Sequence, residues 1–404
     1  MSEFPLAVVD RHAASVRRGS LPPGFGTIWS CVALDLVGFG IVLPILPLYA
    51  EDFGATPFVA TALVATFSAA QLVFSPVWGR VSDRIGRKPV LVLSLAGTAV
   101  GSLITGLAGS LWVLFLGRLL DGVSGASVSV AQAAVADVAP PEQRAKLLGL
   151  LGAAFGLGFV AGPAIGGLAA LGGPEIPFLL AALIAGVNAV AAWKRLPETH
   201  PSPGARRPAV DRVPWRRAGV APLVVVAFVS LSAFSAFEGT FALFGERRLD
   251  LKLASTGGVF AVIGIALVIV QVRVLPAVLD RLGEGGTLRV GLVLNAFGLA
   301  VLAGVDSWAL LVPALLLLVV GQGLVSPTLS SILAGKVDAD RRGGVLGVQQ
   351  AAGGLARVVG PMAGGFLFQE VGVPVPYVAG AALMALAALV ALRPAVSAPA
   401  PSTP

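Results

Sequence analysis

The sequence contains few charged residues: Asp, Glu, Lys and Arg make up only 12% of its 404 residues. A soluble domain has about a quarter of its residues charged, so the composition argues against a soluble protein. Cysteine and histidine are also scarce, with one cysteine and two histidines in the chain. Cys31 therefore has no partner for an internal disulfide. His12 and His200 lie in polar segments and have no cysteine cluster with which to form a metal site.

Apolar residues dominate instead, with 56% hydrophobic residues and a mean hydropathy of +0.90. A membrane-spanning helix needs ~20 apolar residues. Apolar runs bounded by charge, proline and glycine predict an all-α membrane protein with twelve spans. The predicted spans are 27–50, 57–79, 88–108, 111–136, 147–169, 176–194, 219–244, 255–278, 287–304, 307–334, 345–368 and 374–392.

The net charge of +7 could indicate a nucleic-acid partner, but most Lys and Arg residues fall in alternate loops. This distribution is typical of membrane orientation, with basic loops on the cytoplasmic side. Arg247, Arg248 and Lys252 are the exceptions on the outer side. We therefore expect a multi-pass inner-membrane protein with both termini in the cytoplasm and no nucleic-acid partner. Residues 1–26 lack an apolar core of signal-peptide length, so no cleavage is expected.

The two halves of the chain resemble each other. DRIG at 83–86 recurs as DRLG at 280–283, and GPAIGG at 162–167 recurs as GPMAGG at 360–365. Matches at nearly one offset indicate a duplicated six-helix unit, which in transporters places the substrate site between the halves. The predicted domains are an N-terminal bundle at 1–194, a cytoplasmic linker at 195–218 and a C-terminal bundle at 219–404.

The loop after the second span has the sequence GRVSDRIGRKP and runs from Gly79 to Pro89. It matches the pattern G-x-x-x-D-R-x-G-R-[KR]-P throughout and so resembles the major facilitator superfamily. Positive-inside charge alone would explain the arginines but neither Asp83 nor the glycines. The resemblance implies two pseudo-twofold six-helix bundles and a cytoplasmic gate in this loop. The predicted gate residues are Gly79, Asp83, Arg84, Gly86, Arg87 and Lys88.

The fourth span contains Arg118 and, three residues later, Asp121. An arginine inside a span costs ~3 kcal/mol on insertion scales, so it is expected to face a partner or an aqueous cavity. Asp121 lies on the same helix face, and the pair could simply neutralise itself. In the resemblance this arginine belongs to the proton-relay region. Both interpretations stay open, because an ion pair can also act as the relay.

The fifth span matches the antiporter motif G-x8-G-x3-GP-x2-GG at every position. Glycines at every fourth residue make a groove into which another helix can pack, and a proline favours a bend. Generic small-residue packing would not require this spacing, and within the superfamily the motif is typical of exporters. The motif residues are Gly149, Gly158, Gly162, Pro163, Gly166 and Gly167.

The first span has the sequence LDLVGFGIVLPILP at 34–47. Asp35 lies about eight residues into this span, or ~12 Å along the helix. The segment is similar to the first helix of tetracycline:proton antiporters, as are 75–120 and RLPET at 195–199. This likeness covers roughly residues 30–200, whereas the second half resembles general multidrug exporters.

The seventh span contains Glu238 among phenylalanines. A carboxylate beside aromatic rings suits a lipophilic cation and could also carry a proton. Arg357 in the eleventh span is its expected long-range partner. Polar residues in other spans could line the cavity or join helices. The predicted substrate-binding residues are Gln71, Gln132, Phe234, Phe237, Glu238, Phe241, Gln322 and Arg357, with Gln271 and Asn295 as further candidates.

The sequence thus predicts a proton-coupled exporter of small lipophilic compounds, with tetracycline-like ones among the candidates, acting by alternating access. Proton coupling is expected at Asp35, Arg118, Asp121 and Glu238. The expected energy source is the proton gradient, without a cofactor, and the expected unit is a monomer in the lipid bilayer. A proton-coupled uptake permease for a sugar or organic anion is the alternative, which the fifth-span motif disfavours. An enzyme or receptor is not expected, because no loop is long enough to form a domain.

Overall fold

The computed structural model describes residues 21–22, 24–199, 219–337 and 341–393, and this part of the chain contains helices but no strands. The predictions made for residues 1–20, for most of the linker and for both histidines lie outside the described residues. The first-half helices are α1 (Phe25–Val42), α2 (Leu46–Glu51), α3 (Pro57–Ile85), α4 (Arg87–Gly106), α5 (Leu111–Ser124), α6 (Ser127–Val138), α7 (Pro141–Ala169), the 3-10 helix η1 (Ala170–Gly172) and α8 (Ile176–Arg195). The second-half helices are α9 (Val220–Leu249), α10 (Leu253–Ile269), the π-helix η2 (Val270–Val274), α11 (Leu275–Ala303), α12 (Trp308–Gly335), α13 (Arg342–Glu370) and α14 (Val375–Val390).

Ten helical segments of the described chain are long and apolar enough to cross a membrane. One of them, Leu253–Ala303, covers 51 residues and folds back at Gly283, where φ is 64°. Counting this segment as two passes, and adding the shorter apolar helix α14, gives the twelve spans predicted from the sequence. The all-α membrane architecture is therefore confirmed.

Two predicted spans are interrupted within their length. The first span breaks between α1 and α2, around Pro44, because proline has no amide hydrogen to donate to the helix. The fourth span breaks between α5 and α6 at Gly125, which adopts a non-helical conformation with φ −70° and ψ 56°. Each break exposes backbone groups inside the bundle, which neighbouring side chains must satisfy.

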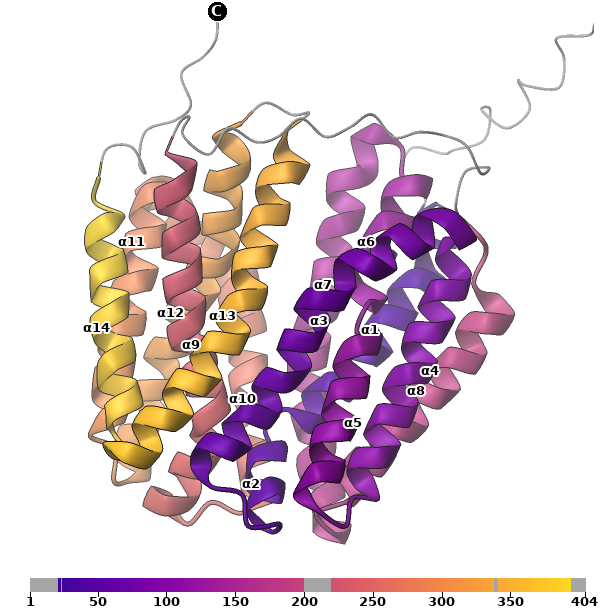
Figure 1. The fold of residues 1–404 in the computed structure, drawn as a ribbon. Coiled ribbons are helices and arrows are strands. Elements are labelled where there is room, and N and C mark those ends of the chain that lie inside the picture. Colours follow the sequence, from indigo (N-terminus) through magenta and orange to yellow (C-terminus); the bar gives the residue numbers. More distant parts are fainter. Residues whose placement is uncertain (1–20, 23, 200–218, 338–340, 394–404) are drawn as a thin grey trace, which may run out of the picture.

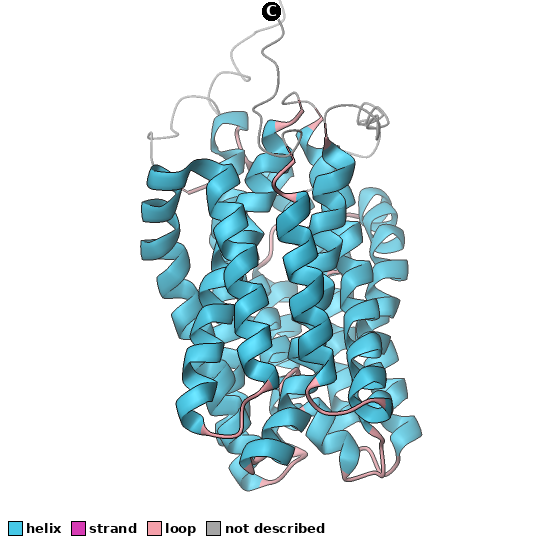
Figure 2. Ribbon diagram, turned by 90° about the vertical axis from the view of Figure 1, so that its left-hand side faces the viewer, coloured by secondary structure: helices cyan, strands magenta, loops and turns pink. Residues whose placement is uncertain are grey.

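The helices run roughly parallel to one axis (Figures 1 and 2). Helices α1 and α9 begin, and α8 and α14 end, at the same end of the bundle (Figure 1). We call this end the linker side, because α8 ends and α9 begins there. The opposite end is called the far side.

The halves contact each other mainly through two helix pairs, α3 with α13 and α7 with α10. At the far side these pairs are tightly packed. A Cβ added to Gly365 of α13 would lie 1.8 Å from the Thr61 hydroxyl of α3. A Cβ added to Gly257 of α10 would lie 2.6 Å from the Cα of Gly167 on α7. Figure 1 shows α3 and α13 converging toward this end.

Toward the linker side the same helices separate. Gly79 of α3, Gly149 of α7 and Gly347 of α13 have no atom within 4 Å of an added Cβ, once each helix's own backbone is set aside. Each of these glycines lies in the linker-side part of its helix. Figure 1 shows α3 and α13 diverging toward the linker side, so the structure describes two halves that are closed together at the far side and parted at the linker side.

Candidate functional site

A charged pair is buried within the first half. The Arg118 Nη1 atom lies 2.7 Å from the Asp121 Oδ2 atom, and only 4% and 8% of these two side chains is exposed. The guanidinium carbon of Arg118 lies 4.6 Å from the ring centroid of Phe67 on α3. The predicted ion pair is thus present, and mutual neutralisation lets two charges remain in an apolar bundle.

Asp35 on α1 lies next to this pair. Its carboxylate accepts a hydrogen bond from the hydroxyl of Ser127, the first residue of α6. Asp121 lies close enough to act electrostatically on Asp35, and its own carboxylate accepts a hydrogen bond from Thr98 of α4. The break in the fourth span therefore matters for the site, because it places Ser127 at a helix start facing α1. Three of the four predicted proton-coupling residues lie together in one half.

The fourth, Glu238, lies in the other half on α9. It interacts electrostatically with Arg357 on α13, the partner expected for it. The two helices pack closely, since a Cβ added to Gly360 of α13 would lie 2.4 Å from the carbonyl oxygen of Ser232 on α9. The structure therefore gives each half one charged cluster inside its helix bundle, and the cluster of the first half is the more deeply buried, because Glu238 and Arg357 are only half-buried.

The phenylalanines around Glu238 differ in burial. Phe237 and Phe241 have 2% and 0% of their surface exposed and belong to the main apolar core. Their ring centroids are 5.2 Å apart, and Phe241 packs edge-on against Phe260 at 5.5 Å. Phe234 is only partly buried and packs against that core. In this conformation Phe234 is the most accessible of the three.

The predicted polar lining residues take different positions. Gln71 on α3 donates a hydrogen bond of 2.9 Å to the carbonyl oxygen of Gly125, and so satisfies a backbone group at the break in the fourth span. Gln322 on α12 makes a polar contact with the side chain of Asn295 on α11. Gln132 is half-buried on α6, and Gln271 is exposed on η2. Gln71 and Gln322 thus make the contacts that join helices.

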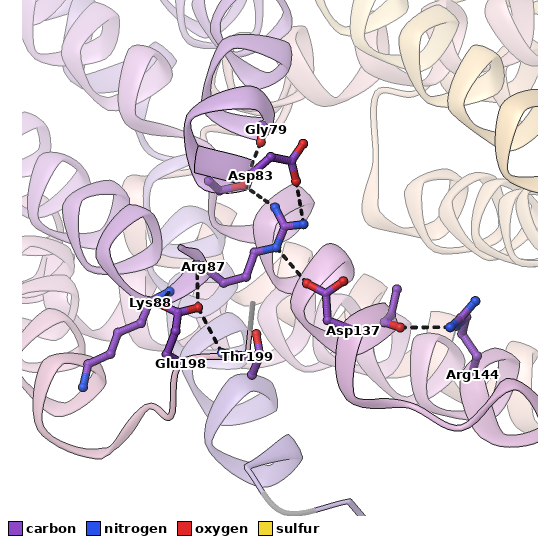
Figure 3. A network of polar contacts seen from close by, with 10 residues as sticks. Gly79, Asp83, Arg87, Lys88, Asp137, Arg144, Glu198 and Thr199 are labelled. Atoms are coloured by element: carbon purple, nitrogen blue, oxygen red, sulfur yellow. Dashed lines mark hydrogen bonds and ion pairs between the residues drawn. The ribbon is translucent and has the colours of Figure 1, made fainter. Parts of the chain in front are cut away.

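The predicted gate loop is organised around a buried arginine (Figure 3). The Arg87 guanidinium lies 2.7 Å from Asp83 and 2.9 Å from Asp137 of α6, with only 2% of its side chain exposed. It also donates to the hydroxyl of Ser82, which in turn donates to the Gly79 carbonyl oxygen. Asp83 is half-exposed and makes no contact with the start of α13 in the described structure. Arg84 and Lys88 are not part of this buried pairing.

Glu198 binds the start of α4 from the residues that follow α8 (Figure 3). Its carboxylate accepts hydrogen bonds from the backbone amides of Arg87 and Lys88, at 2.8 and 3.2 Å. A carboxylate is favourable there because a helix N-terminus carries a partial positive charge. Gly86 is required beside it, since its φ is 104° and an added Cβ would lie 2.4 Å from the carboxylate. The roles of Glu198 and Asp137 were not predicted from the sequence, although Glu198 lies in the RLPET segment that carries part of the resemblance.

The glycines of the fifth-span motif separate into two faces of α7. Cβ atoms added to Gly158 and Gly162 would lie 2.7 and 2.6 Å from backbone carbons of α1, and one at Gly166 would lie 2.8 Å from an α1 carbonyl oxygen. Gly167 instead approaches α10, at 2.9 Å from a carbonyl oxygen. The motif therefore lets α7 pack closely on α1 in its own half and on α10 in the other half. Gly149 lies close to neither helix.

The sequence matches the Major Facilitator Superfamily over residues 28–303 and 274–404. The chain belongs to the Major Facilitator Superfamily. This superfamily chain is 34% identical to the tetracycline resistance protein, class E, of Escherichia coli over 348 residues, covering 83% of this chain and 86% of that protein. It is 30% identical to multidrug resistance protein 1 of Bacillus subtilis (strain 168), covering 91% and 94%.

Among solved structures, a human organic anion transporter is similar, with a TM-score of 0.71, 26% identity, and coverage of 92% of this chain and 100% of that one. Membership of the superfamily makes the chain a membrane transporter and not an enzyme. It also agrees with the two bundles expected from the internal repeat.

Proposed function

We propose that the chain is a proton-coupled exporter of small lipophilic compounds, with tetracycline-like molecules among the candidates. The observation that carries the proposal is the cluster inside the spans that the half-buried Asp35 forms with the buried pair of Arg118 and Asp121. Ionisable groups in spans are costly and mark proton or substrate paths. The tetracycline and multidrug resistance proteins among the relatives supply the substrate class and the outward direction.

The linker side is proposed to be cytoplasmic, in the inner membrane, and the far side external. The basic residues near the linker side support this orientation, as the positive-inside rule requires. The proposed domains are those of the internal repeat, 1–194 and 219–404, joined by the linker at 195–218. Under this orientation the structure represents the inward-facing state, in which substrate enters from the cytoplasm.

Transport would then follow from exchange at the two charged clusters. Asp35 would take a proton when the site is open to the outside and release it to the cytoplasm. The charges of Arg118 and Asp121 beside Asp35 would allow the Asp35 carboxyl to lose its proton inside the bundle. Substrate would bind between the halves, near Glu238, Arg357 and the accessible ring of Phe234. The proton gradient would drive exchange because a bound proton and a bound substrate compete. The other predicted lining residues, Gln132 and Gln322 among them, stay proposals for the same cavity.

The gate loop is proposed to lock the cytoplasmic side when it closes. Asp83 is half-exposed on the linker side and bound only to Arg87 in the parted state. Closure would bring it to the start of α13, where the helix N-terminus attracts a carboxylate. Arg87 would remain anchored by Asp137 throughout. Closure would therefore exchange one partner of Asp83 for another.

A proton-coupled uptake permease is the alternative function for this fold. Accumulation of a drug in cells distinguishes the two directions. The chain is expressed in a drug-susceptible strain that lacks its own efflux pumps, and the steady-state content of tetracycline and of a fluorescent cationic dye is measured. Export predicts lower content than in cells without the chain, restored by a protonophore. Higher content for every compound tested would support uptake and contradict the proposal.

A further inference from the structure

Three charged residues join the two halves at the far side. Glu51, the last residue of α2, lies 3.1 Å from the Nη2 atom of Arg247 on α9. The guanidinium of Arg247 in turn lies 4.9 Å from the ring centroid of Phe368 on α13. The Glu51 carboxyl also lies within hydrogen-bonding reach of the carboxyl of Glu246, the neighbour of Arg247. We call Glu51, Glu246 and Arg247 the far-side clasp.

The contact between Glu51 and Glu246 requires a proton. Two ionised carboxylates are acceptors only, so one of them must be protonated before they can share a hydrogen bond. Arg247 supplies a single positive charge to two acidic groups. With one proton bound, the clasp has one carboxylate and one guanidinium and is electrically neutral. Without that proton it has a net charge of about −1 at the closed interface.

The surroundings of Glu51 leave few other charges to compensate. Helix α2 packs on α3 and α9. The α3 segment from 57 to 79 has no charged residue, and α9 presents Glu246 and Arg247. Asp52 follows Glu51 directly and lies within the electrostatic reach of Glu246. From α13, the side chain of Gln369 accepts from the Phe58 amide and donates to Glu370.

We infer that Glu51 and Glu246 form a second proton-binding site, which holds a proton only while the far side is closed. Opening would separate α2 from α9, expose both carboxyls to water and release the proton. The proton would return to the side from which it came, because the site lies outside the spans at the far end. It would therefore regulate opening by the pH on that side without being transported.

The pH range follows from Glu51. In the closed structure burial, and then the hydrogen bond with Glu246, raise the pKa of Glu51 from 4.5 to about 7 against the opposing effect of Arg247. Once the far side opens and Glu51 is in water, its pKa returns toward the ordinary value of a glutamate. The closed state thus binds the proton more tightly and is favoured most below pH 4.5. By linkage, the ratio of open to closed protein rises by up to about tenfold per pH unit and levels off above pH 7.

The test is a distance measurement across the far side. Spin labels are placed at Ser110→Cys in the first half and Val371→Cys in the second, in full-length protein carrying Cys31→Ala, and their distance distribution is recorded from pH 4.5 to 8. The parent should show a growing long-distance population up to about pH 7. Glu51→Gln, which stays neutral, should remain at the acid-state distribution at every pH.

A second clasp variant and a control variant outside the clasp accompany the measurement. Glu246→Gln leaves Glu51 with Arg247 alone, so the pH response should shrink and move to lower pH. Asp306→Asn removes an exposed acid of the same side, outside the clasp, and should leave the parent's response intact. A parent-like response in both clasp variants, or its equal loss in Asp306→Asn, would overturn the inference. The measurement needs no substrate and no gradient, so its result does not depend on proton-coupled export.

Discussion

Arg87 illustrates how the gate loop holds a charge inside the bundle. Its guanidinium is almost completely buried, and so is the Asp137 carboxylate that it pairs with, at 2% and 4% exposure. Asp83 completes the pairing from the half-exposed end of α3. Since Asp137 comes from α6, this arginine ties three helices of one half together at the linker side.

Arg87→Ala should destabilise the first half severely. It removes a cation that pairs with the buried Asp137 carboxylate, and a buried ion pair that loses one partner costs roughly 3–5 kcal/mol. The measurement is thermal unfolding of the purified protein in detergent. Arg84→Ala, a matched change at an exposed arginine of the same loop, should have little effect. Equal unfolding temperatures for the two variants would show that the buried pairing contributes nothing.

Asp35 and Glu238 are expected to have different roles in exchange: Asp35 carries the proton, and Glu238 binds cationic substrates. Asp35→Asn should abolish proton-driven transport of every substrate, because Asp121, the other carboxylate of its cluster, is already occupied by its ion pair with Arg118. Glu238→Gln should weaken the binding of cationic substrates by about 10- to 100-fold, since a hydrogen bond to a charged group contributes about 1.5–3 kcal/mol. Neutral substrates should still move. Transport of one cationic and one neutral compound by each variant tests this, and the reverse pattern would refute the assignment.

Local charge pairs were predictable from the sequence, and distant ones were not. The spacing of Arg118 and Asp121 places them on one helix face, so their ion pair could be expected. The partners of Arg87 come from elsewhere: Asp137 is 50 residues away, and Glu198 binds its backbone amide from 111 residues away. Nothing in a single sequence relates such positions, because only the packing of α4, α6 and the segment after α8 brings them together.

At the scale of helices, glycine determines where neighbours approach. Helix α7 uses one set of glycines against α1 and another against α10, so it lies at the contact between the halves. The repeat and the apolar runs predicted all twelve spans. The breaks at Pro44 and Gly125 were not predicted, because proline and glycine also occur within continuous helices of this chain, such as Pro76 in α3 and Pro163 in α7.

Gly162→Ala should impair folding or transport. Its added methyl group would lie 2.6 Å from backbone atoms of Gly40, which cannot move aside as a flexible side chain can. Overpacking of this kind costs about 1–3 kcal/mol. Gly149→Ala is the control within the same helix and motif, because nothing lies within 4 Å of its added methyl group. Detergent thermal unfolding compares the two, and equal tolerance would contradict tight packing of α7 on α1.

At the scale of the molecule, the orientation can be tested by labelling from outside. In a Cys31→Ser background, single cysteines at Ser110 and Gly172 should react with an impermeant thiol reagent in intact cells, since both lie at the exposed far side. A cysteine at Lys194, on the linker side, should react only after lysis. Reversed accessibility would refute the proposed orientation, and reaction at all three sites in intact cells would refute the span count.

The whole molecule is two bundles joined at one end and parted at the other, with a charged cluster inside each. That arrangement becomes an exchanger only if substrate movement one way releases protons the other way. Everted membrane vesicles containing the chain, given an acidic interior, measure this directly through a pH-sensitive dye. Adding a transported compound should partly dissipate the gradient, and Asp35→Asn should remove this response. A gradient left unchanged by a compound that the vesicles accumulate would contradict proton-coupled export.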